Sequence, residues 1–275
     1  MNKESIEQLQ DIARHIRFGV VDTIYKAKDG HPGPSLSVAD IVTALYFSVM
    51  NVNPDNPEDP ERDRFILSKG HACPVQYVAL AKLGYFNKSE LPTLRSINSI
   101  LQGHPCIDTV GIDMTSGSLG NGISIGLGME IARQRLGKEY YTYIVVGDGE
   151  LNEGVAWEGI IAAKMNKAEN LIVFVDNNGH QSGGHVSEIS GIEPFEDKFS
   201  DFGWHVQTID GHDISAIIDA IGRAKEKKGV PSVIIAKTIK GKGVSYMENN
   251  NAWHKGVPSE NQWRQAAAEL GVSSI

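Results

Sequence analysis

The sequence has few cysteines, no long apolar run and no surplus of positive charge. Its 275 residues include only two cysteines, Cys73 and Cys106, which are too few for a disulfide framework and typical of reduced cytosolic thiols. No apolar run is long enough to span a bilayer, and no secretory signal is recognisable. A net charge of −8 disfavours nucleic acid and anionic membrane surfaces as partners. We therefore expect a cytoplasmic protein that binds neither nucleic acid nor a membrane.

Internal repeats and low-complexity linkers are also missing, although hydrophobic residues make up 41% of the chain. This composition supports a sizeable core, and we predict a single domain over residues 1–275. No GxGxxG motif, Walker P-loop, Ser/His/Asp triad or cysteine-based zinc site is recognisable. A functional site must therefore be sought in other motifs.

The sequence does contain apolar runs that alternate with helical segments. Runs 143–146 and 171–175 are apolar throughout, which is typical of parallel strands buried on both faces. Ser37 and Asp40 resemble a capping box and predict a helix to about Met50, after a rigid Gly- and Pro-rich loop at 29–35. Residues 178–193 are expected to form a loop.

Further strands are expected at 64–68, 204–209 and 231–238, and further helices at 4–28, 72–83, 153–167, 195–202, 214–227 and 260–270. This order predicts an α/β fold, a doubly wound parallel sheet with helices on both faces.

Polar residues follow both central strands. Asp148 lies between two glycines after the first strand, and Asn178 follows the second. Because the carboxyl ends of parallel strands meet at one edge of the sheet, both side chains would face one ligand. A carboxylate and an amide oxygen suit Mg2+, and the glycines Gly147 and Gly149 let backbone N–H groups approach phosphate. The pattern indicates a metal–diphosphate site, although an ordinary polar turn also fits it.

Four histidines lie in Gly-containing loops, namely His31, His71, His104 and His254. Imidazole suits proton transfer near neutral pH and hydrogen bonding to hydroxyl and phosphate groups. Each histidine taken alone could equally be a surface or capping residue. Together with the metal–diphosphate loops they indicate an active site. Residues 113–128 hold five glycines, which suits a helix that starts against a ligand or packs tightly on a neighbour.

These motifs follow the order found in the amino-terminal half of transketolase, and the chain resembles that family over nearly its whole length. The matching segments are Gly30–Gly33, Asp63–Ala72, Leu101–Pro105, Gly117–Gly120, Gly147–Gly149 and Asp176–Gly179. The resemblance implies the thiamine diphosphate-binding fold, known as the PP domain. It also implies thiamine diphosphate and Mg2+ as cofactors, with Ca2+ or Mn2+ as substitutes for the metal.

The resemblance implies a role for each matching residue. The metal ligands would be Asp148, the side chain of Asn178 and the backbone carbonyl of His180. The cofactor would contact His71, Gly117, Ser118, Leu119, Gly149, Asn178 and His254. The catalytic residues lining the substrate channel would be His31, His71, His104 and His254. Glu153 and Glu158 match acidic residues thought to connect the two active sites of a dimer.

The implied reaction transfers a two-carbon ketol unit from a ketose (phosphate) donor to an aldose (phosphate) acceptor, as in pentose phosphate metabolism. The glutamate that activates the cofactor and the arginines that bind substrate phosphate lie in the second half of the family's sequence. This chain is therefore expected to be active only with a C-terminal subunit that carries the pyrimidine-binding domain, in an α2β2 assembly acting on sugar phosphates.

Two positions depart from the family, which usually has a large aliphatic residue at Ser182 and an acidic residue at Gly183. Ser182 weakens the apolar contact with the thiazolium ring. A sulfonated ketose or a branched one such as apulose 4-phosphate therefore stays open as the substrate. Two other functions also stay open: the α-subunit of a 2-oxo acid dehydrogenase, and a non-catalytic regulatory half.

Overall fold

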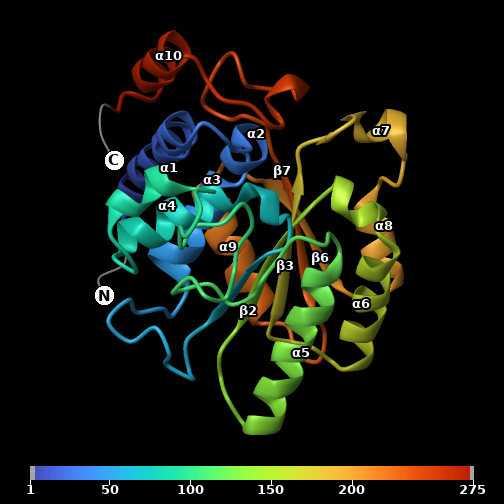
Figure 1. Cartoon of the computed structure of the whole chain (residues 1–275). Coiled ribbons are helices and arrows are strands. Elements are labelled where there is room, and N and C mark those ends of the chain that lie inside the picture. Colours follow the sequence, from blue (N-terminus) through green and yellow to red (C-terminus); the bar gives the residue numbers. More distant parts are fainter. Residues whose placement is uncertain (1–3, 273–275) are drawn as a thin grey trace.

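A five-stranded parallel sheet forms the centre of the molecule, with strand order β1-β2-β3-β7-β6 (Figure 1). The computed structural model describes residues 4–272. The strands are β1 (Arg64–Leu67), β2 (Thr142–Gly147), β3 (Leu171–Asn177), β6 (His205–Asp210) and β7 (Ser232–Lys237). Every neighbouring pair in this sheet is parallel, which confirms the predicted α/β fold.

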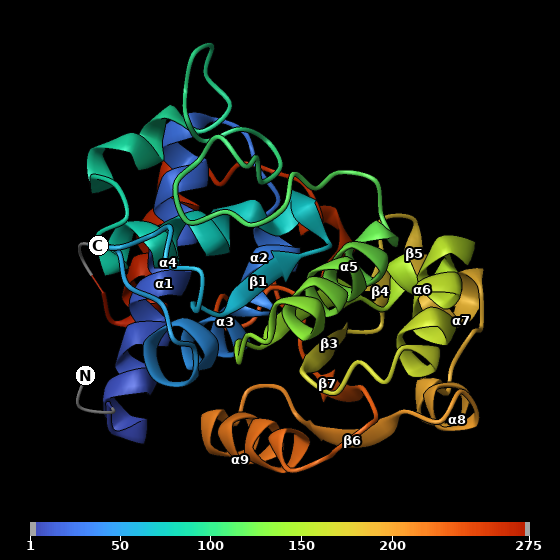
Figure 2. The same ribbon diagram turned by 90° about the horizontal axis from the view of Figure 1, so that it is seen from below.

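Helices cover both faces of the sheet because its three central strands, β2, β3 and β7, are buried on both sides. Alternate residues such as Phe65 and Phe174 pack with α1 (Ile6–Ala27), α3 (Ala39–Ala44), α4 (Cys73–Leu83) and α9 (Ile214–Lys225). The residues between them, such as Val173, pack with α5 (Asn121–Leu136), α6 (Gly154–Met165) and α8 (Phe195–Asp201). Figure 2 shows α1 and α4 on one side of the sheet and α5 and α6 on the other. Each fully buried large apolar side chain contributes about 1.5–3 kcal/mol.

The segment between His31 and Met50 departs from the sequence prediction. Helix starts within the expected rigid loop, as α2 (Pro32–Leu36), and the continuation to Met50 is broken into α3 and a π-helical turn, η1 (Leu45–Val49). Pro32 suits a first helical position because its missing N–H would be unpaired there anyway.

The predicted capping box is wrong. The Ser37 hydroxyl contacts the carbonyl of Pro34 and the carboxylate of Asp176, while the Asp40 carboxylate contacts Arg17 and His212. Tertiary partners replace the local cap.

The expected loop at 178–193 contains regular structure. A short hairpin joins β4 (His180–Gln181) to β5 (Gly184–His185), and α7 (Val186–Ile189) follows it. Ser182 and Gly183 form the two-residue connection, a length that favours hairpins. A 3-10 turn, η4 (Gly149–Asn152), precedes α6, which ends two residues before the predicted boundary.

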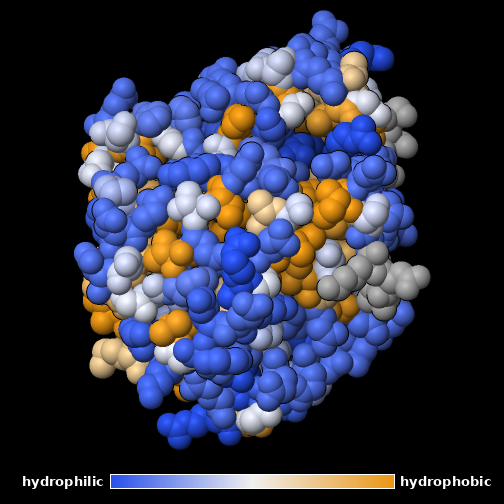
Figure 3. Space-filling view, turned by 180° about the vertical axis from the view of Figure 1, so that it is seen from behind, coloured by the Kyte–Doolittle hydropathy of each residue, from blue (hydrophilic) through white to orange (hydrophobic). Residues whose placement is uncertain are grey.

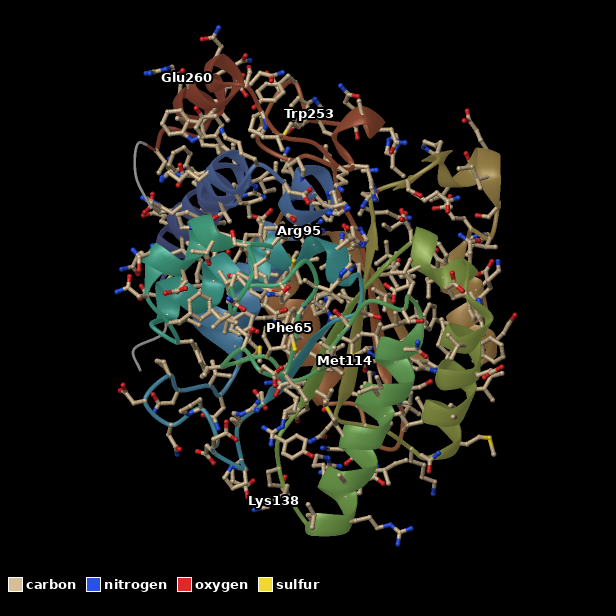
Figure 4. The ribbon with its side chains drawn as sticks, viewed as in Figure 1. Phe65, Arg95, Met114, Lys138, Trp253 and Glu260 are labelled. Carbon is tan, nitrogen blue, oxygen red and sulfur yellow. The ribbon has the colours of Figure 1, made fainter. Side chains whose placement is uncertain are left out.

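The remaining described elements are short 3-10 turns and the last helix. They are η2 (Gly70–Ala72), η3 (Lys88–Thr93), η5 (Asn251–Trp253) and α10 (Glu260–Leu270). Figure 4 places Trp253 at one end of the molecule and Lys138, which follows α5, at the other, with Phe65 between them. Seen from behind, the surface is mostly hydrophilic, with apolar residues in small groups (Figure 3). Within residues 4–272, no helix combines the length and apolarity needed to cross a membrane.

Candidate active site at the carboxyl edge of the sheet

A cavity of about 160 Å³ lies where β2 and β3 end. This edge of a parallel sheet is where ligands of such folds bind. Asp148 and Asn178 both line the cavity, so the two strand-end loops do meet there. The other predicted site residues that line it are His71, Leu119, Gly149, His180 and His254. Further lining comes from Pro34, Lys69, Gly147, Glu150, Gln181, Ser182 and Lys240.

The metal-binding side of the cavity is held by hydrogen bonds. The carboxylate of Asp148 accepts the N–H of Gly149 at 2.7 Å and that of Gly179 at 2.6 Å. The Asn178 amide donates to Asp176 at 2.9 Å, and its oxygen accepts the N–H of His180 at 3.0 Å. Asp176 therefore turns the amide oxygen of Asn178 away from itself and towards the β3–β4 loop.

This donor set suits a hard cation. Burial, reinforced by Asp176, raises the pKa of Asp148 to about 7, so a cation beside it would relieve an unfavourable buried charge. No three Asp, Glu, His or Cys side chains of the described chain gather as a metal cluster. One carboxylate, one amide and one main-chain carbonyl match Mg2+, which completes its shell with phosphate and water.

Two lysines in the cavity were missed by the sequence analysis. Lys69 forms a salt bridge with Asp176. Lys240 is 1% exposed, and its ammonium donates to Asn251 at 2.6 Å without a salt bridge to any described residue. Burial and the nearby Lys69 lower the pKa of Lys240 to about 8. A buried ammonium with only neutral acceptors favours an anionic ligand.

A sequence signal for Lys240 existed. It follows the end of β7, as Asp148 follows β2 and Asn178 follows β3, but its glycine neighbours suggested only a flexible turn.

Three of the four predicted histidines gather in a cluster beside this cavity. The ring centroid of His31 lies 5.3 Å from that of His71 and 5.7 Å from that of His254, and the last two are 5.1 Å apart. Burial, reinforced by Arg95 and Lys255, lowers the pKa of His31 to about 4. The cluster thus joins loops that are far apart in the sequence.

The other histidines in the site are also held neutral. Burial and Lys240 lower the pKa of His254 to about 4, and burial with Lys69 lowers the pKa of His71 well below its usual value. These imidazoles are neutral near pH 7, so each has one donor and one acceptor nitrogen.

Four predicted residues lie outside the cavity lining, namely His31, which belongs to the histidine cluster, and His104, Gly117 and Ser118. His104 nevertheless lies next to Gly70, the chain neighbour of His71, because a β-carbon placed on Gly70 would lie 3.2 Å from the His104 ring. Gly117 is adjacent to His104, and Ser118 is exposed. Glu153 and Glu158 are also exposed, at the start of α6 and on its outer face.

The residues present fit thiamine diphosphate with a divalent cation. The buried Nδ1 atoms of His31 and His254 have no hydrogen-bond partner, which leaves polar positions for a ligand. Lys240 supplies a positive charge, and the Asp148–Asn178 pair supplies oxygen ligands. The individual roles of these residues stay predictions.

Comparison with known proteins agrees with this geometry. Residues 8–274 match the family model described as "Transketolase, thiamine diphosphate binding domain". The chain is 45% identical over 271 residues to the 6-deoxy-6-sulfo-D-fructose transketolase subunit SqwG of Clostridium sp. (strain MSTE9), and the match covers 98% of both chains. It is 39% identical to an apulose-4-phosphate transketolase subunit of Phocaeicola vulgatus, covering 96% of this chain and 94% of that one.

Longer transketolases match over less than half of their length. The human transketolase is 34% identical, covering 98% of this chain but 43% of that protein. The structure of the Leishmania mexicana transketolase superposes with a TM-score of 0.93 at 32% identity, covering 99% of this chain and 42% of that one. The chain therefore belongs to the transketolase family, in which it corresponds to the thiamine diphosphate binding domain.

Proposed function

We propose that this chain is the cofactor-binding subunit of a split, Mg2+-dependent transketolase. The observation that carries this proposal is the cavity in which Asp148, Asn178 and Lys240 converge beside three neutral histidines. The family match favours ketol transfer over the 2-oxo acid dehydrogenase alternative. The intact cavity disfavours a purely regulatory half.

Each group in the cavity has a defined task. Asp148, Asn178 and the carbonyl of His180 would hold the metal, and Lys240 would neutralise part of the diphosphate charge. When bound, thiamine diphosphate supplies the carbanion chemistry for cleaving the C2–C3 bond of a ketose. The histidines His31, His71, His104 and His254 would bind the substrate's hydroxyl and carbonyl groups and move protons between them.

The proposed donor is a ketose with an acidic group at its far end. The relative with 45% identity acts on 6-deoxy-6-sulfo-D-fructose and that with 39% identity acts on apulose 4-phosphate, according to their names. We take the sulfonated ketose as the main candidate and the branched phosphate as the second. Ser182 lines the cavity in the β4–β5 hairpin, where it leaves room for a pocket different from that of ordinary transketolases.

The proposed assembly is α2β2 with a C-terminal subunit that carries the pyrimidine-binding domain. Its support is a set of exposed apolar residues, here called the apolar face, on two helices that pack together, α5 and α6. This face includes Ile125, Leu136, Ile161 and Met165, and Met165 is 77% exposed. Exposed apolar faces of this kind mark protein interfaces. The two free cysteines, Cys73 and Cys106, support a cytoplasmic location.

The test is to co-purify this chain with its C-terminal partner and to measure cofactor-dependent ketol transfer. The donor panel contains 6-deoxy-6-sulfo-D-fructose, apulose 4-phosphate and an unmodified ketose phosphate. We expect activity only when both chains are present, and the highest kcat/KM with the sulfonated donor. Turnover by this chain alone, or no thiamine diphosphate binding in the complex with Mg2+, would refute the proposal.

Variants of the apolar face test the assembly separately. Ile161→Asp should reduce the proportion of the larger complex in analytical ultracentrifugation, because a charge in an apolar interface is costly. Ile6→Asp, at the start of α1 away from this face, is the matched control. Equal masses for both variants would contradict the assignment of this face.

A further inference from the structure

Hydrogen bonds hold the chain in place on both sides of Lys240. The Thr238 hydroxyl donates to the buried carboxylate of Asp176, and the N–H of Ile239 donates to Nε2 of His212 at 2.8 Å. On the other side of Lys240, Gly241 donates its N–H to the carbonyl of Gly33 at 3.1 Å. The direction in which Lys240 enters the cavity is therefore set by its neighbours.

The contact between Ile239 and His212 fixes the imidazole's tautomer. Because Nε2 accepts a hydrogen bond, the proton of a neutral ring lies on Nδ1. Nδ1 faces the carboxylate of Asp40 at 2.8 Å, and Asp40 forms a salt bridge with Arg17. The side chains of Arg17, Asp40 and His212 are 8%, 7% and 13% exposed. A buried relay thus runs from α1 through α3 to the loop after β7.

The side chains of this relay lie outside the cavity lining. Neither Asp40 nor His212 is among the residues that line the cavity, and β6 and β7 lie next to each other, which brings the residues after both strands together (Figure 1). Lys240, the residue after Ile239, lines the cavity. Its ammonium is directed at the neutral oxygens of Asn251 and Gln181.

We propose that His212 is a positioning residue for Lys240, acting through the Ile239 N–H, so that the Arg17–Asp40–His212 relay sets the affinity of the cavity for a diphosphate. The inference rests on the proposed function, because it requires an anion in the cavity. It assigns to a buried histidine outside the site an effect on ligand affinity.

The test distinguishes the contacts made by the two ring nitrogens of His212, Nδ1 with Asp40 and Nε2 with Ile239. In His212→Gln the amide reaches the position of Nε2 and retains an acceptor for Ile239. In His212→Asn the shorter amide reaches only the position of Nδ1 and keeps the contact with Asp40. The probe is inorganic pyrophosphate with Mg2+, titrated calorimetrically into the purified full-length chain, and thermal unfolding checks that each variant is folded.

We expect His212→Asn to weaken pyrophosphate binding about 10-fold and His212→Gln to stay within about 3-fold of the wild type, since one charge-assisted contact is at stake. A double-mutant cycle with Lys240→Met shows the route of the effect. In the Lys240→Met background, His212→Asn should add less than about 2-fold, because the group that it positions is gone. If His212 had a purely structural role, the effect of His212→Asn on pyrophosphate affinity would persist in the Lys240→Met background.

Other results would contradict the inference, the proposed function or both. Three results would overturn the inference alone. They are wild-type affinity in folded His212→Asn, equal losses of affinity in both amide variants, and an undiminished effect of His212→Asn in the Lys240→Met background. No pyrophosphate binding by the wild-type chain would overturn the proposed function with it. If His212→Asn does not fold, His212→Ser replaces it with the same expected loss of affinity, because it also removes the Nε2 acceptor of Ile239, and a water molecule in the space left solvates that N–H without fixing its direction.

Discussion

Asp148 and Asp176 stand at the ends of neighbouring parallel strands, yet their surroundings differ. Asp176 lies directly across from Gly147, the residue before Asp148, and both carboxylates are buried. Asp176 has its own cation in Lys69. Asp148 accepts only main-chain N–H groups and has no salt bridge to a described residue.

The pKa values of the two carboxyl groups consequently shift in opposite directions. Burial raises the pKa of Asp148 to about 7. At Asp176 burial acts in the same direction, but the charge of Lys69 and the hydrogen bonds around the carboxylate outweigh it and lower the pKa. A buried carboxylate that is paired with a cation of its own chain, such as Asp176 with Lys69, stabilises the fold. A buried one that lacks a cation marks where an external cation would be stabilised.

The largest expected effect on stability comes from removing the cation of Asp176. Lys69→Met leaves a fully buried carboxylate without its salt bridge, so the free energy of unfolding should fall by about 3–5 kcal/mol. Urea unfolding measures this loss. The double variant Lys69→Met/Asp176→Asn should recover a large part of it, and Lys228→Met, at an exposed lysine, is the control. A loss below about 1 kcal/mol would show that Asp176 does not depend on Lys69.

The matching change at Asp148 should affect binding rather than folding. Asp148→Asn removes a buried charge but leaves one of the two N–H groups without an acceptor, so the net change in stability should be within about 1 kcal/mol, whereas affinity for thiamine diphosphate with Mg2+ should fall by about 100-fold. Equilibrium binding in the presence and absence of Mg2+ measures the effect, with Asp201→Asn on the surface as control. Unchanged Mg2+-dependent binding would remove Asp148 from the metal site.

A smaller effect is expected at Ser37, whose hydroxyl lies 2.7 Å from the carboxylate of Asp176. Ser37→Ala should cost about 1 kcal/mol in urea unfolding because one hydrogen bond to a buried carboxylate is lost. In the Lys69→Met/Asp176→Asn background this cost should shrink. A cost that persists unchanged there would mean that Ser37 acts locally on its helix.

The last prediction concerns the pH dependence of stability. His31 and His254 have a pKa of about 4 in the fold against an ordinary value of 6.5. Between these values the unfolded chain binds more protons, so the free energy of unfolding falls as the pH falls from about 6.5 towards 4. The variant His31→Gln/His254→Gln should lose part of this slope in thermal unfolding scans. A slope identical to that of the wild type would show that the two histidines are not held neutral.

Much of the fold and part of the site follow from local sequence patterns. Apolar runs at β2 and β3 predict buried parallel strands because only such strands lack a polar face. The residues after them, Asp148 and Asn178, share one cavity because parallel strands end at the same edge. Sequence order also places His31, His71 and His254 in loops, although not in contact with one another.

The remaining features depend on partners that are distant in the sequence. Ser37 and Asp40 satisfy a local capping pattern, but Asp176 lies 139 residues from Ser37 and His212 lies 172 residues from Asp40. Buried charged partners compete successfully with a cap worth about 1 kcal/mol. No local pattern contains that information.

The sequence by itself determined the parallel α/β sheet, the edge at which a ligand binds and the residue types available there. Only the tertiary structure decided which of two adjacent aspartates is neutralised by Lys69, and that Lys240 enters the cavity without a carboxylate partner. The physical reason is that periodicity and strand ends are local properties, whereas burial and charge pairing depend on which distant segments come into contact.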